Sequence, residues 1–194
     1  LKDFTKENKI KAIALCDTVN LCGALEFSEK MSKVGTQPII GTQINFKYLD
    51  TIGLLPLYAL NEIGYKRIIE LSSLSYLQND KLSEPHIDFN ELLKSNEGVA
   101  LFSGTINGLH GQLFDKGKFK EIGELYSKLK EYYGDRFYIE IQRHGDQNEA
   151  GFERFNLTQS LKIEIPIIAT NETFYINKDM HEAHDALICI KNKT

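Results

Sequence analysis

The sequence predicts an α/β fold in which a largely parallel sheet, closed or nearly closed into a barrel, is wrapped by helices. Strand-like and helix-like segments alternate repeatedly along its 194 residues, an order typical of parallel sheets whose strands are joined by helical crossovers. Apolar residues make up 42% of the chain and charged residues 26%, which is ordinary for a globular protein. A chain of this length can bury the core of one large domain.

Short apolar runs bounded by turn-forming residues predict the strands, and these runs cover residues 11–16, 38–46, 53–60, 98–102, 137–142 and 165–169. The first run is nearly continuous, which is typical of a strand that is buried on both faces. Pro56 lies within the third run. Because proline cannot donate a hydrogen bond to a neighbouring strand, we expect this run at a sheet edge or at an irregularity.

Apolar residues that recur with helical spacing predict helices, at residues 24–33, 61–77, 89–93, 118–133, 148–161 and 183–190. The segment 118–133 has the clearest apolar stripe, and Gly134 ends it. Asp179 and Glu182 have the spacing of a capping box, which predicts where the last helix begins. Residues 1–8 have the pattern of the second half of a helix and begin with leucine, so we expect a fragment of a longer chain.

The charge and the cysteines narrow the function classes. A net charge of −4, from 27 acidic and 23 basic residues, argues against a dedicated nucleic-acid-binding surface, which is usually strongly basic. Cys16, Cys22 and Cys189 are odd in number and lack the close spacing of metal ligands, so a reduced, cytoplasmic setting is expected. No apolar run approaches the roughly 20 residues that span a membrane, and no signal peptide is visible.

The segment 137–145 alternates apolar and polar residues like a strand and then presents Gln142, Arg143 and His144 at its C-terminal end. Ligand sites of parallel α/β folds collect at that end of the strands. Other polar residues lie at or just past predicted strands, and they are Asp17, Gln43, Ser103, Asn171 and Glu172. Converging Asp, Glu and His side chains could bind a divalent metal. Such residues are also common turn formers, and the pattern alone favours that interpretation.

Three weaker patterns favour structural roles. His181 and His184 are three residues apart on a predicted helix, one residue short of the zinc-protease spacing. The glycine-containing loop that begins at Ser103 lacks the Gly-Lys-Ser/Thr of a phosphate-binding loop. Asp17, Ser103 and His144 are the residue types of a nucleophilic triad, but no G-x-S-x-G turn surrounds the serine.

Residues 14–27, ALCDTVNLCGALEF, resemble the segment ALTDxxNLxGAxEF of the polymerase and histidinol phosphatase (PHP) domain that begins the alpha subunit of bacterial DNA polymerase III. Further segments resemble that domain in the same order, at residues 37–43, 61–65, 134–145, 169–175 and 181–190. The resemblance covers essentially the whole chain. It implies a distorted seven-stranded (β/α) barrel whose mouth holds a cluster of metal ligands in active members.

The resemblance also implies what residues 1–194 lack. The first strand of the family's barrel carries a His-x-His motif and is expected just before Leu1, and the polymerase domains are expected downstream. The chain is therefore interpreted as a single PHP-domain fragment of a cytoplasmic replicase, without its first strand. The catalytic aspartates of the polymerase, with their magnesium, are expected outside this fragment.

Carried over residue by residue, the family's metal-ligand set is incomplete in this sequence. Asp17 and His144 are retained, whereas Gln43 stands where the family has Glu, and Glu172 where it has Asp. Family histidines correspond to residues of other types, at Thr18, Leu54 and Phe174. These side chains cannot supply the charge that holds divalent cations. Asp17, Gln43, His144 and Glu172 are therefore interpreted as vestigial metal-site positions, with no catalytic residue and no bound metal expected in the fragment.

The resemblance supports two hypotheses of function. In the first, the domain is a scaffold of the replicase holoenzyme and a docking surface for its proofreading exonuclease subunit, epsilon, and it meets DNA through the parent chain. In the second, it is a zinc- or manganese-dependent phosphoesterase or 3′–5′ exonuclease in its own right. A third interpretation, an unrelated barrel enzyme with a site at its strand ends, leaves the ordered motif matches unexplained.

Overall fold

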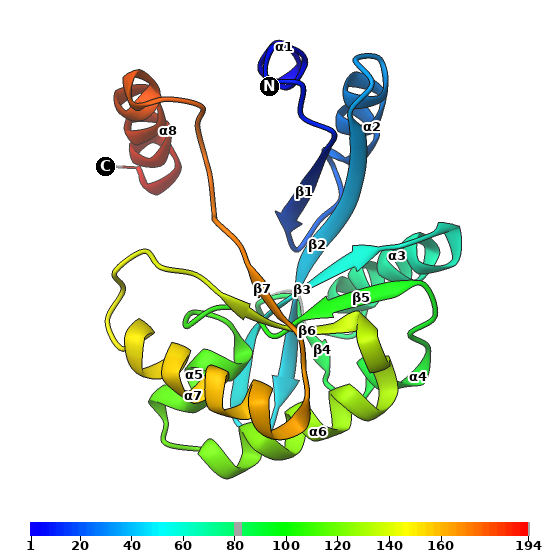
Figure 1. Ribbon diagram of the computed structural model, residues 1–194, viewed down its shortest axis with the longest axis vertical. Coiled ribbons are helices and arrows are strands. Elements are labelled where there is room, and N and C mark those ends of the chain that lie inside the picture. The colour runs from blue at the N-terminus through cyan, green and yellow to red at the C-terminus, as the bar shows by residue number, and fades with distance from the viewer. Residues whose placement is uncertain (80–82, 194) are drawn as a thin grey trace.

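The computed structural model describes residues 1–79 and 83–193 and shows a curled, mixed sheet with helices packed against it (Figure 1). The strands are β1 (Ala12–Thr18), β2 (Gln37–Tyr48), β3 (Thr51–Ala59), β4 (Ile87–Asp88), β5 (Val99–Phe102), β6 (Phe137–Ile141) and β7 (Ile167–Ala169). The helices are α1 (Lys2–Glu7), α2 (Ala24–Ser32), α3 (Glu62–Leu77), α4 (Glu91–Lys94), α5 (Leu109–Asp115), α6 (Phe119–Tyr133), α7 (Glu149–Ile163) and α8 (His181–Asn192). Two 3₁₀ turns are η1 (Gly134–Arg136) and η2 (Lys178–Met180).

The sheet order is β1-β2-β3-β5-β6-β7, and β4 pairs with β2 beside this path. β1 is parallel to β2, and β6 is parallel to β5 and β7, whereas β3 is antiparallel to both of its neighbours. The predicted α/β class is confirmed, and the curled sheet fits the expected distorted barrel. The expectation of parallel strands is wrong for β3. Only two residues connect Tyr48 to Thr51, and a parallel neighbour would need a much longer crossover.

The hydrophobic core lies between one face of the sheet and helices α3, α5 and α6. Strand residues with no exposed surface form one side of it, and they include Ile44, Phe46, Leu55, Leu57, Leu101, Phe137 and Ile139. Helix α6 contributes the residues of its predicted apolar stripe, which are Ile122, Leu125, Tyr126, Leu129 and Tyr133. Because one face of the sheet is covered by these helices, a functional site has to use the opposite face.

Two expectations about the strands are wrong. β1 is not buried on both faces, because it lies at the end of the sheet order beside β2 and leaves Ala12 and Ala14 exposed. β3, which contains Pro56, is neither an edge strand nor irregular at the proline, because it lies between β2 and β5 and its register with β2 runs through Pro56 without interruption. The proline is tolerated because β5 pairs with residues 57–59, so no β5 residue is aligned with it.

Helix α8 stands apart from the sheet at the end of an extended segment (Figure 1). It packs chiefly against its own leading segment, where the ring of His184 stacks on Phe174 at 5.2 Å and lies 5.5 Å from the ring of Tyr175. The helix begins at His181, and no side chain caps its first turn. The predicted capping box is therefore wrong, because Asp179 belongs to the preceding turn η2.

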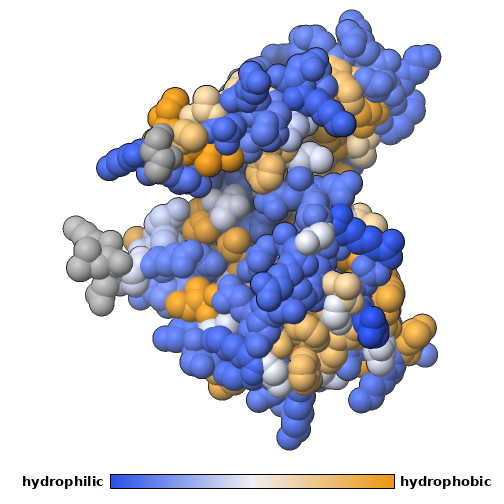
Figure 2. All heavy atoms as spheres, turned by 90° about the vertical axis from the view of Figure 1, so that its left-hand side faces the viewer, coloured by the Kyte–Doolittle hydropathy of each residue, from blue (hydrophilic) through white to orange (hydrophobic). Residues whose placement is uncertain are grey.

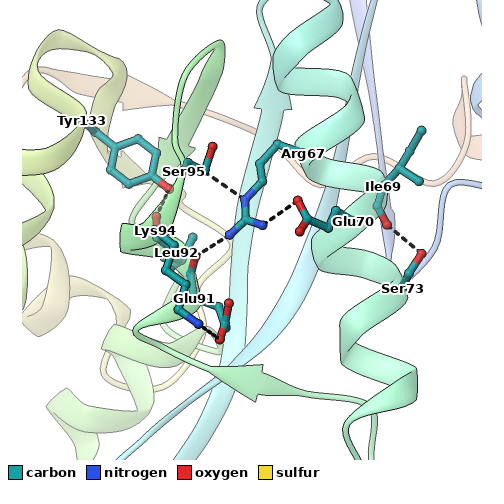
Figure 3. A network of polar contacts seen from close by, with 9 residues as sticks. All are labelled: Arg67, Ile69, Glu70, Ser73, Glu91, Leu92, Lys94, Ser95 and Tyr133. Carbon is teal, nitrogen blue, oxygen red and sulfur yellow. Dashed lines mark hydrogen bonds and ion pairs between the residues drawn. The ribbon is translucent and has the colours of Figure 1, made fainter.

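The guanidinium of Arg67 joins α3 to the segment around α4 (Figure 3). Its Nε donates a hydrogen bond to the carbonyl of Ser95 at 3.0 Å, and its Nη2 donates to the carbonyl of Glu91 at 2.6 Å. Nη1 lies 2.7 Å from the carboxylate of Glu70, and the Arg67 side chain is only 7% exposed. These bonds satisfy carbonyl groups that the short helix α4 leaves without partners inside the helix.

Arg67→Met is therefore expected to lower the free energy of unfolding by about 2 kcal/mol, because two carbonyl groups lose their donors while the apolar stem is retained. Urea unfolding followed by circular dichroism measures the change. Lys66→Met is the matched control, since Lys66 is exposed and pairs with Glu62 on the helix surface, where ion pairs contribute little. Equal midpoints for the two variants would contradict the role assigned to Arg67.

Candidate functional site

The two faces of the sheet carry different side chains. Along β6, Phe137 points into the core, so Tyr138 and Glu140, one and three residues further on, point to the opposite face. Residues that are aligned on neighbouring strands lie on the same face, and the pairing of β1 and β3 with β2 extends this second face across the sheet. We call it the inner face, and its side chains include those of Cys16, Gln43, Tyr58, Phe102, Tyr138 and Glu140.

Glu140 is a carboxyl residue of the inner face that is only 4% exposed. Its Oε1 accepts a hydrogen bond from Thr170 Oγ1, and Gln142 donates to the same hydroxyl at 2.9 Å. Its Oε2 has no hydrogen-bond partner among the described residues. Burial raises the pKa of this carboxyl, the bond from Thr170 lowers it, and the charge of Glu172 raises it further. The backbone of Gly104 also lies close enough to lower this pKa, so Glu140 is a buried acid held from the loop after β5 and from the segment after β7.

Cys16 and Tyr58 lie beside Glu140, and their side chains are close enough to influence each other's pKa. Burial raises the pKa of the Cys16 thiol to about 12 and raises the pKa of the Tyr58 hydroxyl as well. Gly41 makes room for the tyrosine ring, because a Cβ there would lie 2.5 Å from Tyr58 Cδ1. The thiol therefore keeps its proton at neutral pH and is a poor nucleophile and metal ligand.

The first two vestigial positions, Asp17 and Gln43, lie on opposite faces of the sheet. Gln43 is aligned with Thr18 and belongs to the inner face. Asp17 precedes Thr18 in β1, so its side chain lies on the opposite face of the sheet. It points toward the start of α2, where a Cβ built on Gly23 would lie 3.0 Å from Asp17 Oδ2. The sequence pattern shows only that both residues lie near a strand end. Whether their side chains converge depends on the register of β1 and β2, which the sequence does not show.

The other two vestigial positions lie beyond the strand ends. His144 is exposed in the loop after β6, and its backbone N–H donates to the carboxylate of Glu149 at 2.9 and 3.0 Å. Glu172 is exposed in the segment after β7, and its charge acts on both Glu140 and Cys16. Of the four vestigial positions, Gln43 is on the inner face and Glu172 is close to it.

The donor set does not fit a metal centre. Within residues 1–79 and 83–193, no group of three or more His, Cys, Asp or Glu side chains is placed so that it could hold a metal ion. Thr18 and Gln43 supply neutral oxygens at best, and the Cys16 thiol is protonated. Divalent ions in proteins are held by several deprotonated ligands around one point.

The nominal triad of the sequence is not assembled. Ser103 is fully buried, and its Oγ accepts a hydrogen bond from the backbone N–H of Glu140 at 2.9 Å. The imidazole close to it is that of His110, whose Nδ1 donates to the Ser103 carbonyl at 2.7 Å. Asp17 and the exposed His144 belong to other parts of the molecule. Ser103 therefore fastens β5 to β6 and is not an exposed nucleophile.

Sequence reasoning missed four residues of this site, namely Cys16, Tyr58, Glu140 and Thr170. The sequence contained one indication of Glu140, because it is a carboxyl residue within the alternating strand 137–142. That strand has neighbours on both sides in the sheet. A carboxyl in the middle of such a strand is unusual. The other three could not be found, because their contacts with Glu140 depend on strand register and on the path of the chain after β7.

A comparison with protein families connects this arrangement to known proteins. The family model described as "PHP domain" matches residues 2–144, most of the chain. The chain belongs to the PHP-domain family. The match includes β1, the curled sheet up to β6, and the three vestigial positions Asp17, Gln43 and His144.

Similar proteins extend the match beyond the PHP family model. The chain is 38% identical to DNA polymerase III subunit alpha of Rickettsia felis over 190 residues, which cover 97% of this chain and 16% of that protein. It is 35% identical to the subunit of the same name in Caulobacter vibrioides, over 96% of this chain and 17% of the relative. It is 31% identical to the subunit of the same name in Vibrio cholerae, over 92% of this chain and 16% of that protein. The chain thus spans about one sixth of the length of these relatives.

Structural similarity adds less. One solved structure from Bifidobacterium adolescentis aligns with 86% of this chain and 78% of its own chain at a TM-score of 0.40 and 12% identity. Likeness at this level carries no argument about function. Among the described residues, no helix is both long and apolar enough to cross a membrane.

Proposed function

We propose that this PHP domain is part of a DNA polymerase III alpha subunit and acts there as a metal-free scaffold and a docking surface for the proofreading exonuclease subunit. The observation that carries this proposal is the similarity of nearly the whole chain to alpha subunits from different bacteria. The residues that catalyse nucleotidyl transfer, bind magnesium and contact DNA then lie in the parent chain, outside residues 1–194. The parent chain acts in the cytoplasm.

The geometry of the inner face supports the loss of metal-dependent chemistry. Asp17 and Gln43 point to opposite faces, and His144 lies in an exposed loop. Glu140, a buried carboxyl of the sheet, accepts a hydrogen bond from Thr170. Because ligands must be deprotonated and converge before they bind a cation tightly, these residues favour a scaffold over a phosphoesterase.

The charge of the chain supports contacts with protein. A net charge of −4 offers no electrostatic attraction for a phosphate backbone, which dominates nucleic-acid affinity. A partner subunit, by contrast, can be recognised by acidic and apolar side chains together. The exonuclease subunit is the partner that the resemblance to the replicase domain implies.

Metal content and 3′-exonuclease activity of the full-length subunit test the first part of the proposal. We expect no stoichiometric zinc or manganese and no removal of 3′ nucleotides by the purified subunit. Stoichiometric metal and an activity that His144→Ala abolishes, while the control His181→Ala retains it, would establish the alternative, a metal-dependent phosphoesterase or exonuclease.

Association with the purified exonuclease subunit tests the second part. We expect the two subunits to elute together from a gel-filtration column and to separate when residues 1–194 are removed from the alpha subunit. The polymerase activity of the shortened subunit on a primed template serves as the folding control. Undiminished association after removal of the domain would contradict the docking role.

A further inference from the structure

Helix α8 carries an apolar stripe that is left exposed. Ala183, Leu187 and Ile190 recur at helical spacing and therefore lie on one side of the helix. The side chains of Leu187 and Ile190 are 63% and 74% exposed. Asp185 lies on the opposite side, so α8 has one apolar and one polar side. We call Ala183, Leu187 and Ile190 the α8 stripe.

A helix of this length needs a packing partner. α8 has 12 residues, and isolated helices shorter than about 12–15 residues are marginal in water, because most helix stability in proteins comes from packing an apolar face. No residue of α8 is buried, and no side chain caps its first turn. The ring contacts of His184 with Phe174 and Tyr175 leave the α8 stripe exposed. By contrast, the apolar side of α6 is buried in the core.

The exposed apolar surface continues onto the segment that leads to α8. Phe174 is 65% exposed and Ile176 is 47% exposed. Figure 2 shows hydrophobic surface on the part of the molecule that carries α8, and a hollow separates this part from the one formed by α5 and α7. Because α8 stands apart from the sheet (Figure 1), the described residues of the domain do not cover this surface.

The small size of the α8 stripe restricts what can cover it. A helix of 12 residues is about 18 Å long and about 10 Å wide, so one side of it offers on the order of 200 Å². Stable contacts between separate proteins bury roughly 800 Å² on each partner. A second copy of this chain or a separate subunit, held by α8 alone, would therefore bind weakly. A segment of the same polypeptide needs no such area, because the covalent connection gives it an effective concentration in the millimolar range.

The relatives contain enough further polypeptide to provide such a segment. The matches cover nearly all of this chain but only 16% or 17% of each alpha subunit, so these subunits are about six times as long as the chain. Most of a parent subunit of this kind lies outside residues 1–194. The α8 stripe is then a contact between this domain and another part of the same polypeptide.

We propose that the α8 stripe is covered by an apolar segment of the parent alpha subunit from outside residues 1–194, so that α8 fastens this domain to the rest of the subunit. The inference rests on the scaffold function proposed above and assigns its contact surface. It requires the stripe to be buried in the full-length subunit alone, without the exonuclease subunit and without a second copy.

Photo-cross-linking of the full-length subunit identifies what covers the stripe. Leu187 is replaced by p-benzoylphenylalanine, which on illumination couples to C–H bonds that it touches, and mass spectrometry maps the products. We expect intramolecular cross-links to peptides outside residues 1–194. The same group at Asp185, on the polar side of α8, is the matched control and should give at least tenfold less of this product.

Any other main product would overturn the proposal. Cross-links within residues 1–194 would show that the domain covers its own helix, and cross-links between isotopically labelled and unlabelled subunits would show a second copy. A product that forms only after addition of the purified exonuclease subunit would assign the stripe to the docking surface. That result would leave the proposed docking function standing.

Hydrogen exchange of the full-length subunit gives a second readout. The amides of α8 should exchange at least tenfold more slowly in the wild type than in the double variant Leu187→Ala/Ile190→Ala, since alanine keeps the helix propensity and removes only the packing. Asp185→Ala is the control and should not speed this exchange, and equal protection of β2 in all three proteins shows that the domain stays folded. Equally fast exchange of α8 in the wild type and the double variant would overturn the proposal. The measurements of metal content and of association described above test the proposed function separately, so its failure is distinguishable from failure of the α8 contact.

Discussion

Replacing Gly64 with alanine is expected to lower the free energy of unfolding by more than about 4 kcal/mol, a large part of the stability of an ordinary domain. Gly64 lies in the first turn of α3, where the helix meets the backbone that leads into β5. A Cβ at Gly64 would lie 1.8 Å from the carbonyl oxygen of Gly98 and 2.4 Å from its carbonyl carbon. Both are backbone atoms that cannot rotate away, so the helix or the strand must move.

The same contact organises the start of the helix, which makes such a movement costly. The side chain of Asn61 caps α3 and accepts a hydrogen bond from the Gly64 N–H at 3.0 Å. The N–H of Leu60 donates to the Gly98 carbonyl at 2.8 Å. Gly98 itself has φ +68°, which other residues rarely adopt. Relief of the clash would therefore break the cap or this hydrogen bond.

Gly123→Ala is the control, because Gly123 also lies within a helix but has space around it. The nearest atom to a Cβ there is Gln159 Oε1 at 3.6 Å, an ordinary contact. Alanine is favoured over glycine inside a helix by about 1 kcal/mol, so this variant should be slightly more stable. Urea unfolding followed by circular dichroism compares both. A Gly64→Ala protein with the wild-type midpoint would refute the predicted clash.

Acidification from pH 7 to pH 4 is expected to cost the fold about 3 kcal/mol through His110 alone. The imidazole is fully buried, and its Nε2 has no partner among the described residues. Burial lowers the pKa of His110 to about 4 from its ordinary 6.5, and the bond to the Ser103 carbonyl opposes this only in part. A pKa difference of about 2.5 corresponds to ~3 kcal/mol.

The sign follows from which state holds the proton more tightly. The unfolded chain protonates His110 near pH 6.5 and the folded chain only near pH 4, so the stability is fully present above pH 6.5 and is lost as the pH falls to 4. Urea unfolding at several pH values measures the loss. His110→Asn should be less stable at pH 7 but should not show the loss of stability between pH 6.5 and pH 4 that His110 causes. His181→Asn, at an exposed position, should show the same loss as the wild type. Parallel losses in all three proteins would rule out His110 as the cause.

The elements were predictable to the extent that their side chains repeat with the spacing of a helix or a strand. Helix α6 shows this best, because its stripe faces a single core. The direction of β3 was not predictable, because alternation looks the same in parallel and antiparallel strands. Its connection to β2, Leu49–Asp50, also lacks the Asn-Gly or Gly signal of a two-residue turn, although Leu49 adopts φ +54°.

The candidate site was less predictable than the fold. Strand-end position placed Asp17, Gln43, His144 and Glu172 near one rim, but the pleat sends Asp17 and Gln43 to opposite faces. Glu140 could have been found from its place in the strand. Its hydrogen-bond partners could not, because they depend on which groups the segment after β7 brings close.

The antiparallel strand β3 also has a consequence for the kinetics of folding. β2 and β3 are the two longest strands, of 12 and 9 residues, and they pair from Tyr48 and Thr51 outward across a two-residue connection. Closing so short a loop has a small entropic cost, and hairpins form within microseconds. The parallel pairs must wait for their intervening helices to form. The hairpin is thus the part of the sheet from which pairing can spread to β1 on one side and β5 on the other.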